Sequence, residues 1–536
     1  MCSALEILIM TAVLAGAEST PFSIGIELPA QVPVTPAVEN ALRAMGIDYF
    51  NYYIKPSQYC DDEKAMAINR ELIALADRLD VDFSIACYTV DPPEAVVREA
   101  KGHPRFQGIV FDELEHARLL NAHTPTPLAD TEQLESLEQA YAETLDGFRA
   151  LHDRYAALDT PVVSTHIWPV LHHVAARAGF IPCPKICKEL YSSVSLAIGM
   201  GAALQYDRPL WVDVDMWFWD LVPGHPPEEV ESNLLLAYWL GADRVYIEGA
   251  GHNLTTQGEQ GIPFSLMTQV TPERYQLTAH GEMLRRFIRE YLPANPRPWT
   301  FRDVKPDIAI VRFPDSDHGQ HYTHLGQPAW DDTQLYGSPH LLSTPDTRAW
   351  FQIWNLITFG ATGLDGLTYF KHTSARAGFE GGGDPQRVVQ SLHSRPFQAD
   401  HHRFFVPLNG AVVFDHLVAY EHLKDIPLIF VTGVALSDDT RDAIERCAEE
   451  GATVVFWGPL AKQHGFADYE GGFEIHDRGE GRIILTDDFN SRRVFAQVHH
   501  LIGLPNAIRY RFGDEVVRLE RVTDNEVRVV RSRVEP

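Results

Sequence analysis

The chain has 536 residues, more than one hydrophobic core ordinarily serves, so two or three domains are expected. Its formal net charge of −28 disfavours binding to nucleic acid or to an anionic membrane surface, and it favours a neutral substrate over a polyanionic one. Six cysteines are too few for a disulfide framework in a chain of this length. Residues 5–17 resemble the apolar part of a signal peptide, but no Lys or Arg precedes them, so a secreted and a cytoplasmic location both stay open.

Short apolar runs alternate with amphipathic stretches from Phe22 to about Pro298. Such alternation predicts parallel βαβ units, and eight units within this length predict a (β/α)8 TIM barrel over residues 22–298. An open doubly wound sheet is the alternative, but no glycine-rich phosphate loop follows the first expected strand. The eight expected strands begin at Phe22, Asp48, Asp82, Gly108, Pro161, Pro209, Arg244 and Pro263.

Two prolines in residues 295–298 mark the end of the barrel, and a second α/β pattern follows over residues 303–505. Helices are expected at about 345–358 and 437–450. Residues 506–536 alternate in polarity and predict a small antiparallel β unit, whereas residues 1–21 form an N-terminal segment ahead of the barrel. The strands expected in the second domain begin at Ile308, Gly366, Ala411, Pro427, Thr453 and Arg482.

Carboxylates follow two of the expected barrel strands, at the end where a parallel barrel builds its active site. The fourth strand ends in Asp112 and Glu113, and the strand counted as the seventh ends in Glu248. Cleavage of a glycosidic bond needs two carboxyl groups, one to protonate the leaving oxygen and one to attack or to activate water. The pattern therefore predicts Glu113 and Glu248 as a catalytic pair, with Glu115 as the competitor of Glu113.

This arrangement resembles clan A of the glycoside hydrolases, in which the acid/base ends the fourth strand and the nucleophile ends the seventh. By position, the resemblance implies a retaining β-glycosidase with Glu113 as acid/base and Glu248 as nucleophile. The clan usually has Asn before the acid/base, where this chain has Asp112. An ionised Asp only accepts hydrogen bonds, so the contact to the sugar 2-hydroxyl must differ, and the added negative charge would raise the pKa of Glu113.

The order of domains is also similar to that of family 42 β-galactosidases and their relatives, in which a flavodoxin-like domain and a small β domain follow the barrel. Residues 275–281, which open the last barrel helix, are similar to the corresponding segment of many clan members. The resemblance implies that the second domain forms contacts in a homo-oligomer or walls one side of the cleft. No cofactor is implied.

Polar and aromatic residues at the other strand ends favour a carbohydrate pocket, because aromatic rings stack on sugar faces while carboxylates and imidazoles bind hydroxyls. The expected ligand is an oligo- or polysaccharide or a small glycoside. The expected substrate-binding residues are Glu27, Tyr53, Tyr88, Asp112, His166, Trp168, Asp213, Asp215, Trp217, His252 and Asn253.

Two other functions stay open. A metal-dependent barrel hydrolase could use His166, Asp213, Asp215 and His252, although the first strand lacks the HxH pair typical of amidohydrolases. Cys183 and Cys187 lie four residues apart, but no second Cys or His pair completes a zinc site, so no metal site is predicted. A non-catalytic carbohydrate-binding barrel would not need its two strand-ending glutamates to face each other.

Overall fold

A computed structural model describes the chain over most of both expected domains. The expected N-terminal segment lies almost wholly outside the described part. Among the described residues, no helix is both long and apolar enough to cross a membrane. The described residues are 20–29, 34–53, 62–88, 90–119, 127–130, 134–166, 169–187, 191–216, 225–248, 266–271, 273–315, 341–364 and 405–534.

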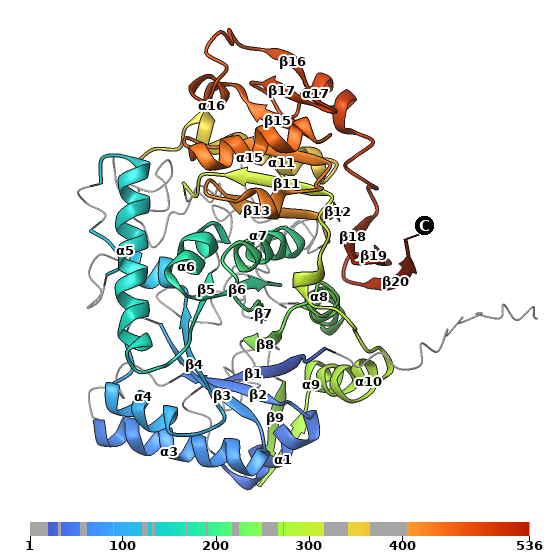
Figure 1. Ribbon diagram of the computed structural model, residues 1–536. Coiled ribbons are helices and arrows are strands. Elements are labelled where there is room, and N and C mark those ends of the chain that lie inside the picture. Colours follow the sequence, from blue (N-terminus) through green and yellow to red (C-terminus); the bar gives the residue numbers. More distant parts are fainter. Residues whose placement is uncertain are drawn as a thin grey trace, which may run out of the picture.

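Eight parallel strands close into a barrel, and helices between them cover its outside (Figure 1). This confirms the (β/α)8 TIM barrel expected from the alternating pattern. The strands are β1 (Ser23–Pro29), β2 (Tyr49–Tyr53), β3 (Asp82–Cys87), β4 (Phe106–Asp112), β5 (Val162–His166), β6 (Ile181–Ile186), β7 (Trp211–Asp215) and β8 (Arg244–Glu248). The main helices are α1 (Pro36–Met45), α3 (Asp62–Leu79), α4 (Glu94–Lys101), α5 (Leu137–Ala156), α6 (His172–Ala178), α7 (Ser192–Gln205), α8 (Pro227–Trp239) and α9 (Ala279–Arg286).

The identity of one strand differs from the prediction. Strand β6 is not among the expected strands, and its Pro182 and Pro184 are unusual for a strand inside a sheet. The two prolines occupy alternate positions, so both missing N–H groups point toward the same neighbour; β6 accordingly pairs with β5 over four residues but with β7 over only two. The run from Pro263 was wrongly expected as the eighth strand: its described part forms a hairpin of β9 (Met267–Thr271) and β10 (Arg274–Leu277) outside the barrel.

The corrected count moves the later strands by one position. The run from Pro209 is the seventh strand, and Glu248 ends the eighth strand rather than the seventh. The closing contact of the barrel pairs β8 with β1. By the rule that places the clan A nucleophile on strand seven, Asp213 and Asp215 now occupy the position that the prediction gave to Glu248.

Side chains fill the barrel interior in layers, because every second residue of a strand points inward. The middle layer is apolar and aromatic, and the strand positions two residues further toward the mouth are polar. Val110 is thus followed by Asp112, and Cys183 by Lys185. Trp211 and Tyr246 are followed in the same way by Asp213 and Glu248. The middle layer contains Tyr49, Ala86, Val110, Val163, Cys183, Trp211 and Tyr246.

The second domain is a six-stranded sheet in the order β13-β11-β14-β15-β17-β16. Its five parallel strands follow the flavodoxin-like order 2-1-3-4-5, and β16 is added antiparallel at the edge. The expected strand from Gly366 lies outside the described residues. The elements are β11 (Ile308–Arg312), α11 (Pro345–Ile357), β13 (Ala411–Asp415), α14 (Tyr420–Leu423), β14 (Leu428–Thr432), α15 (Asp438–Glu449), β15 (Thr453–Trp457), α16 (Gly458–Gln463), β16 (Phe473–Arg478), β17 (Gly481–Thr486) and α17 (Arg492–Val498).

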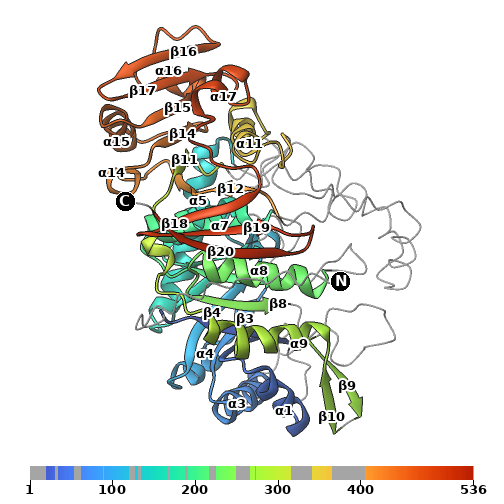
Figure 2. The same cartoon turned by 90° about the vertical axis from the view of Figure 1, so that its right-hand side faces the viewer.

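The C-terminal tail forms a separate small sheet that touches the barrel. Strands β18 (Ala507–Phe512), β19 (Glu515–Arg521) and β20 (Val527–Arg533) are antiparallel, and β12 (Leu408–Asn409) adds to β18 in parallel. In Figure 2 this sheet lies beside α8. The Ser232 hydroxyl on α8 donates to the Asn525 carbonyl and accepts from the Val527 N–H, which ties the sheet to the barrel.

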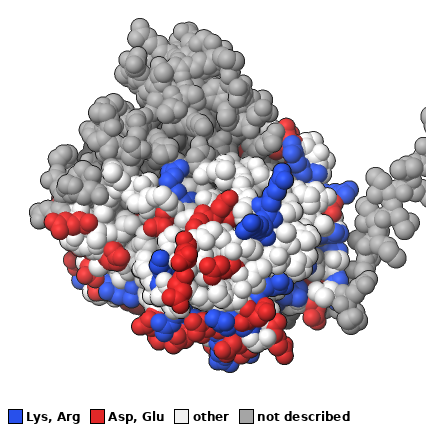
Figure 3. All heavy atoms as spheres, turned by 90° about the horizontal axis from the view of Figure 1, so that it is seen from above, with Lys and Arg blue, Asp and Glu red and all other residues white. Residues whose placement is uncertain are grey.

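Charge is mixed on the face seen in Figure 3, where acidic and basic side chains of the described residues lie intermingled among uncharged ones. The large negative charge of the chain is therefore not gathered into one continuous patch on this face.

The two α/β domains pack where α6 and α7 meet the edge strand β13 (Figure 1). His173 Nε2 donates to the Val413 carbonyl at 2.9 Å, and the Ser193 hydroxyl donates to the Val406 carbonyl at 3.0 Å. At Gly201, helix α7 approaches so closely that an added Cβ would fall within the van der Waals radius of the Val413 oxygen. Glycine at this position therefore sets the spacing between the domains.

The close approach predicts that Gly201→Ala destabilises the protein by about 1–3 kcal/mol, the usual cost of forcing a methyl group into a packed interior. Urea unfolding measures this difference. Gly102→Ala is the matched control, because Gly102 has helical φ and ψ and a new methyl group there meets only the preceding turn of its own helix, with Glu99 O at 3.3 Å. Equal stability of the two variants would contradict the proposed spacing role.

Candidate active site

One buried lysine lies at the centre of the carboxylates at the barrel mouth. Lys185 Nζ on β6 is fully buried and lies within 4 Å of five carboxyl groups from β4, β7 and β8 and from the residue after β4. We call these six residues the Lys185 cluster. The distances from Nζ are 2.8 Å to Asp112 Oδ1, 3.1 Å to Glu113 Oε1, 3.8 Å to Asp213 Oδ2, 3.5 Å to Asp215 Oδ2 and 2.5 Å to Glu248 Oε2.

The two glutamates of the expected catalytic pair contact the same ammonium. Because Glu113 Oε1 and Glu248 Oε2 lie 3.1 and 2.5 Å from Lys185 Nζ, these oxygens cannot be farther apart than the sum of the two distances. This bound applies to the two contacting oxygens and is compatible with the ~5–5.5 Å carboxyl spacing of a retaining pair. The two side chains therefore lie together at the barrel mouth, although Glu248 ends the eighth strand rather than the seventh.

The backbone at Glu113 explains how two consecutive residues reach one ammonium. In a regular strand, Asp112 and Glu113 would point to opposite faces. Glu113 instead has φ 45, in the left-handed region that costs a non-glycine residue about 1–3 kcal/mol. Its N–H still donates to the Thr165 carbonyl at 3.0 Å. The backbone therefore turns at the last hydrogen bond that joins β4 to β5. Backbone strain of this kind typically marks a functional position.

Asp112 is held by three donors from three strands. Lys185 and the Thr165 hydroxyl donate to Oδ1 at 2.8 and 2.9 Å, and the Tyr53 hydroxyl donates to Oδ2 at 2.5 Å. The structure thus brings the expected residues Asp112 and Tyr53 into one network. Asp112 acts only as an acceptor in these contacts, as expected for an ionised Asp.

Burial raises the pKa of several carboxyl groups around the lysine. Burial and then the charge of Glu248 raise the pKa of Glu27 well above its ordinary value, and burial raises that of Asp112. For Lys185, burial lowers the pKa, but the surrounding carboxylates, Asp112 foremost, outweigh it and raise the pKa well above its ordinary value. The ammonium therefore keeps its charge, and protons stay on some carboxyl groups at neutral pH.

Asp213 and Glu248 form a carboxyl pair on neighbouring strands. Burial raises the pKa of Asp213 to about 8, and burial followed by repulsion from Asp215 raises that of Glu248 well above its ordinary value. Both side chains also face the Lys185 ammonium, whose Nζ lies 3.8 Å from Asp213 Oδ2 and 2.5 Å from Glu248 Oε2. The Tyr246 hydroxyl also donates to Asp213 Oδ2 at 3.1 Å. A carboxyl group with a pKa raised in this way keeps its proton at a pH where an isolated carboxyl group has lost it.

His166 and Glu115 lie behind the barrel wall. Because Thr165 points inward, its neighbour His166 points outward, where its ring packs against Phe148 of α5 and against His172. Its Nδ1 contacts Glu115, which lies in the π-helical turn η1 (Glu115–Leu119), and both side chains are fully buried. The expectation that His166 binds substrate at the mouth is therefore corrected, and Glu115 is not placed to compete with Glu113.

The other expected site residues divide into described and undescribed ones. Glu27 on β1 is buried and interacts electrostatically with Glu248 and Asp112. Tyr88 follows β3 and is partly exposed, and its carbonyl accepts a bond from Arg118 at 3.4 Å. Four expected substrate-binding residues lie outside the described residues and stay predictions: Trp168, Trp217, His252 and Asn253.

Sequence reasoning missed Lys185, the central residue of the site. The reason is the missed strand, since none of the expected strands covers residues 181–186. Two signals pointed to a strand there. Gly179 ends α6 in the left-handed conformation, and two consecutive helices of a βα barrel require a strand between them. A charged residue at the end of that strand would then have joined the candidates.

Comparisons with known proteins show similarity in the course of the backbone, without similarity in sequence. No family model and no curated protein matches this chain. An exo-β-1,4-mannosidase from Opitutaceae bacterium strain TAV5 covers 91% of this chain and 96% of its own, with 10% identity and a TM-score of 0.49. A family 17 β-1,3-glucanosyltransferase from Rhizomucor miehei covers 43% and 87%, with 9% identity and a TM-score of 0.28. The barrel itself is shown by the pairing of its eight strands.

The raised pKa of Asp213 predicts a pH-dependent stability. Between the ordinary Asp value of 3.8 and about 8, the folded protein keeps a proton that the unfolded chain has released, so the free energy of unfolding falls as pH rises through this range. Asp213→Asn is neutral at every pH and lacks this loss. We expect its Tm relative to wild type to increase between about pH 5 and about pH 8, as measured by calorimetry. Asp468→Asn on the surface is the control, and equal pH slopes of the two variants would contradict the assignment.

Proposed function

We propose that the chain is a glycoside hydrolase that cleaves a β-glycosidic bond by double displacement, with Glu113 as acid/base and Glu248 as nucleophile. One observation carries the proposal: a single ammonium contacts an oxygen of each glutamate, at 3.1 and 2.5 Å. A retaining enzyme needs its two carboxyl groups about 5–5.5 Å apart, and contact of both groups with one ammonium is compatible with that spacing. A binding barrel without catalysis has no need of such a pair.

Exposure supports Glu248 as nucleophile over the carboxylates of strand seven. The side chains of Asp213 and Asp215 are fully buried, whereas those of Glu113 and Glu248 are 12% and 10% exposed. A nucleophile has to reach the anomeric carbon, so it must lie on the surface of the pocket. Asp213 and Asp215 are then supporting residues that set the charge behind Glu248.

In the proposed reaction, a Glu248 carboxylate oxygen bonds to the anomeric carbon while the glycosidic C–O bond breaks and Glu113 gives its proton to the departing oxygen. Glu113 then takes a proton from water, the water oxygen bonds to the anomeric carbon, and the Glu248 ester bond breaks. Lys185 stays charged throughout; it stabilises Glu248 as a carboxylate before the first step and after the second.

The charge of the site favours a neutral or cationic sugar. Five carboxyl groups surround one ammonium, and Glu27 adds a sixth buried carboxyl group nearby. A uronic acid would bring another negative charge close to these carboxyl groups, and the low effective dielectric constant of a buried site would strengthen the repulsion. Lys185 Nζ already lies 3.8 and 3.5 Å from Asp213 and Asp215, the two carboxylates that the alternative metal-dependent hydrolase would use. A panel of neutral nitrophenyl glycosides should therefore contain a substrate.

Azide rescue distinguishes the two proposed roles by the configuration of the product. In Glu248→Ala, azide attacks the anomeric carbon from the vacated side in one displacement, so the glycosyl azide should have inverted configuration. In Glu113→Ala, Glu248 still forms the glycosyl-enzyme with an activated aryl glycoside, and azide then gives the retained product. Both variants should lose about 100-fold or more of their activity without azide.

The anomeric configuration is read by NMR on the isolated azide. Glu115→Gln is the control, because Glu115 lies behind the wall and its removal should leave turnover independent of azide. The same product configuration from both alanine variants, or full activity in Glu248→Ala, would overturn the assignment.

The raised pKa of Glu248 also predicts the acid limb of the pH profile. The nucleophile must be ionised, and burial together with Asp215 raises its pKa well above the ordinary value of 4.5. Activity should therefore fall, as pH decreases, already above pH 4.5. The measurement is kcat/KM against pH, which reports the free enzyme. An acid limb at or below the ordinary Glu value would contradict Glu248 as the ionising nucleophile.

A further inference from the structure

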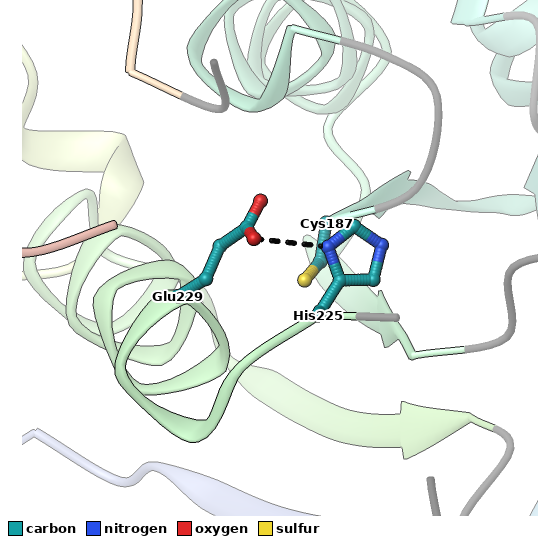
Figure 4. Close-up of side chains that lie close together, drawn as sticks. All are labelled: Cys187, His225 and Glu229. Atoms are coloured by element: carbon teal, nitrogen blue, oxygen red, sulfur yellow. Dashed lines mark ion pairs between the residues drawn. The ribbon is translucent and has the colours of Figure 1, made fainter. Parts of the chain in front are cut away.

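A second buried cluster lies beside the Lys185 cluster and has no part in the proposed hydrolysis. Cys187 is the first residue after β6, His225 lies two residues before α8, and Glu229 lies in the first turn of α8. All three are buried, and they point toward one another in Figure 4. The sequence prediction dismissed Cys187 as a ligand because no partner was visible, whereas the fold brings two partners to it.

The three side chains converge on a single point. One candidate ligand atom from each residue, a thiol sulfur, an imidazole nitrogen and a carboxylate oxygen, lies within 4.8 Å of the other two. His225 Nδ1 lies 3.2 Å from Glu229 Oε2, and in Figure 4 the Cys187 sulfur lies on the same side of the ring as this nitrogen. A nucleophilic Cys-His-Glu relay would instead place the thiol and the carboxylate at opposite ring nitrogens. Convergence at one nitrogen is the arrangement of ligands around an ion.

The backbone around each residue is held by its own hydrogen bond. The Cys187 N–H donates to the Ser192 hydroxyl at 3.2 Å, His280 Nε2 donates to the His225 carbonyl at 2.9 Å, and the Asn233 amide donates to the Glu229 carbonyl at 2.9 Å. Cys187 itself has φ 73, a left-handed conformation that a cysteine adopts only at a cost. The surroundings therefore force the thiol into this position.

Among the described residues, Glu229 has few of the partners that a buried carboxylate ordinarily needs. Its side chain is fully buried, and among the described residues its contact is with His225, whose Nδ1 lies 3.2 Å from Oε2. A carboxylate desolvated in this way costs free energy unless a cation or donors compensate it. A metal ion at the point of convergence would supply that compensation.

We propose that Cys187, His225 and Glu229 bind a divalent metal ion of the zinc type, through the Cys187 sulfur, His225 Nδ1 and a Glu229 oxygen. Thiolate, imidazole and carboxylate are all zinc ligands, whereas the thiolate excludes hard cations such as Mg²⁺ and Ca²⁺. Binding forms the metal–sulfur and metal–nitrogen bonds and releases to solvent the Cys187 thiol proton and the Nδ1 proton of the His225 imidazolium, and a water completes a tetrahedral set. The ion ties the end of β6, two residues beyond Lys185, to the start of α8.

Cobalt substitution of the full-length protein tests the site without a mutation. The chelator-treated protein is titrated with Co²⁺ and its absorption spectrum recorded. One equivalent should bind and produce a thiolate-to-cobalt charge-transfer band together with the intense visible bands of tetrahedral cobalt, and Zn²⁺ should displace both. Binding without the charge-transfer band, or no saturable binding, would overturn the proposal.

Two variants of the proposed ligands and one control variant assign the bands to these residues. Cys187→Ser should lose the charge-transfer band, whereas Cys447→Ser, which changes another buried free cysteine in the second domain, should retain it. Glu229→Gln keeps the side-chain shape and should weaken cobalt binding by at least about tenfold. Loss of a residue that only hydrogen-bonds to a metal ligand already costs about this much, and loss of a ligand itself should cost no less. Unchanged affinity in Glu229→Gln, or loss of the band in Cys447→Ser, would contradict the assignment even if Cys187→Ser fails to fold.

Discussion

The ammonium of Lys185, buried between five carboxyl groups, is the interaction on which the candidate site depends. Without it, carboxylates from three strands would repel one another at low dielectric constant and would have to separate or take up protons. With it, the carboxyl groups stay close, and the pKa values shift instead. Removing one member of such a buried ionic group typically costs about 3–5 kcal/mol, so the arrangement is strongly coupled to the fold.

The barrel supplies this arrangement through the two-residue period of its strands. Each apolar residue of the middle layer is followed, two positions on, by a polar residue at the mouth, and parallel strands bring all those positions to the same end. Glu113 is the exception, because its left-handed backbone turns a second carboxylate toward the lysine next to Asp112. Strain at this position and crowded charge around Lys185 both oppose stability, and the barrel and its packed second domain offset them.

Much of the fold could be predicted from the sequence, because strands buried on both faces are continuous apolar runs and helices show their period. The barrel, the α/β character of the second domain and the antiparallel tail follow from such patterns. Strand β6 could not be recognised in this way, because Pro182 and Pro184 are the residues that argue against a strand. That single omission hid Lys185 and shifted the strand count, so Glu248 was associated with the wrong strand although it lies at the mouth. Cys187, His225 and Glu229 were hidden for another reason: they come from the end of β6 and from the start of α8, and only the fold brings them together.

Covalent trapping tests most directly whether Glu113 and Glu248 work as a displacement pair around Lys185. The reagent is a 2-deoxy-2-fluoro derivative of a cleaved glycoside with an activated leaving group. The fluorine slows both steps because it disfavours the oxocarbenium-like transition state. The activated leaving group restores the rate of the first step alone. The glycosyl-enzyme then accumulates and the labelled peptide can be mapped by mass spectrometry. The account predicts the label on Glu248, and a label on Asp213 or Asp215 would contradict it.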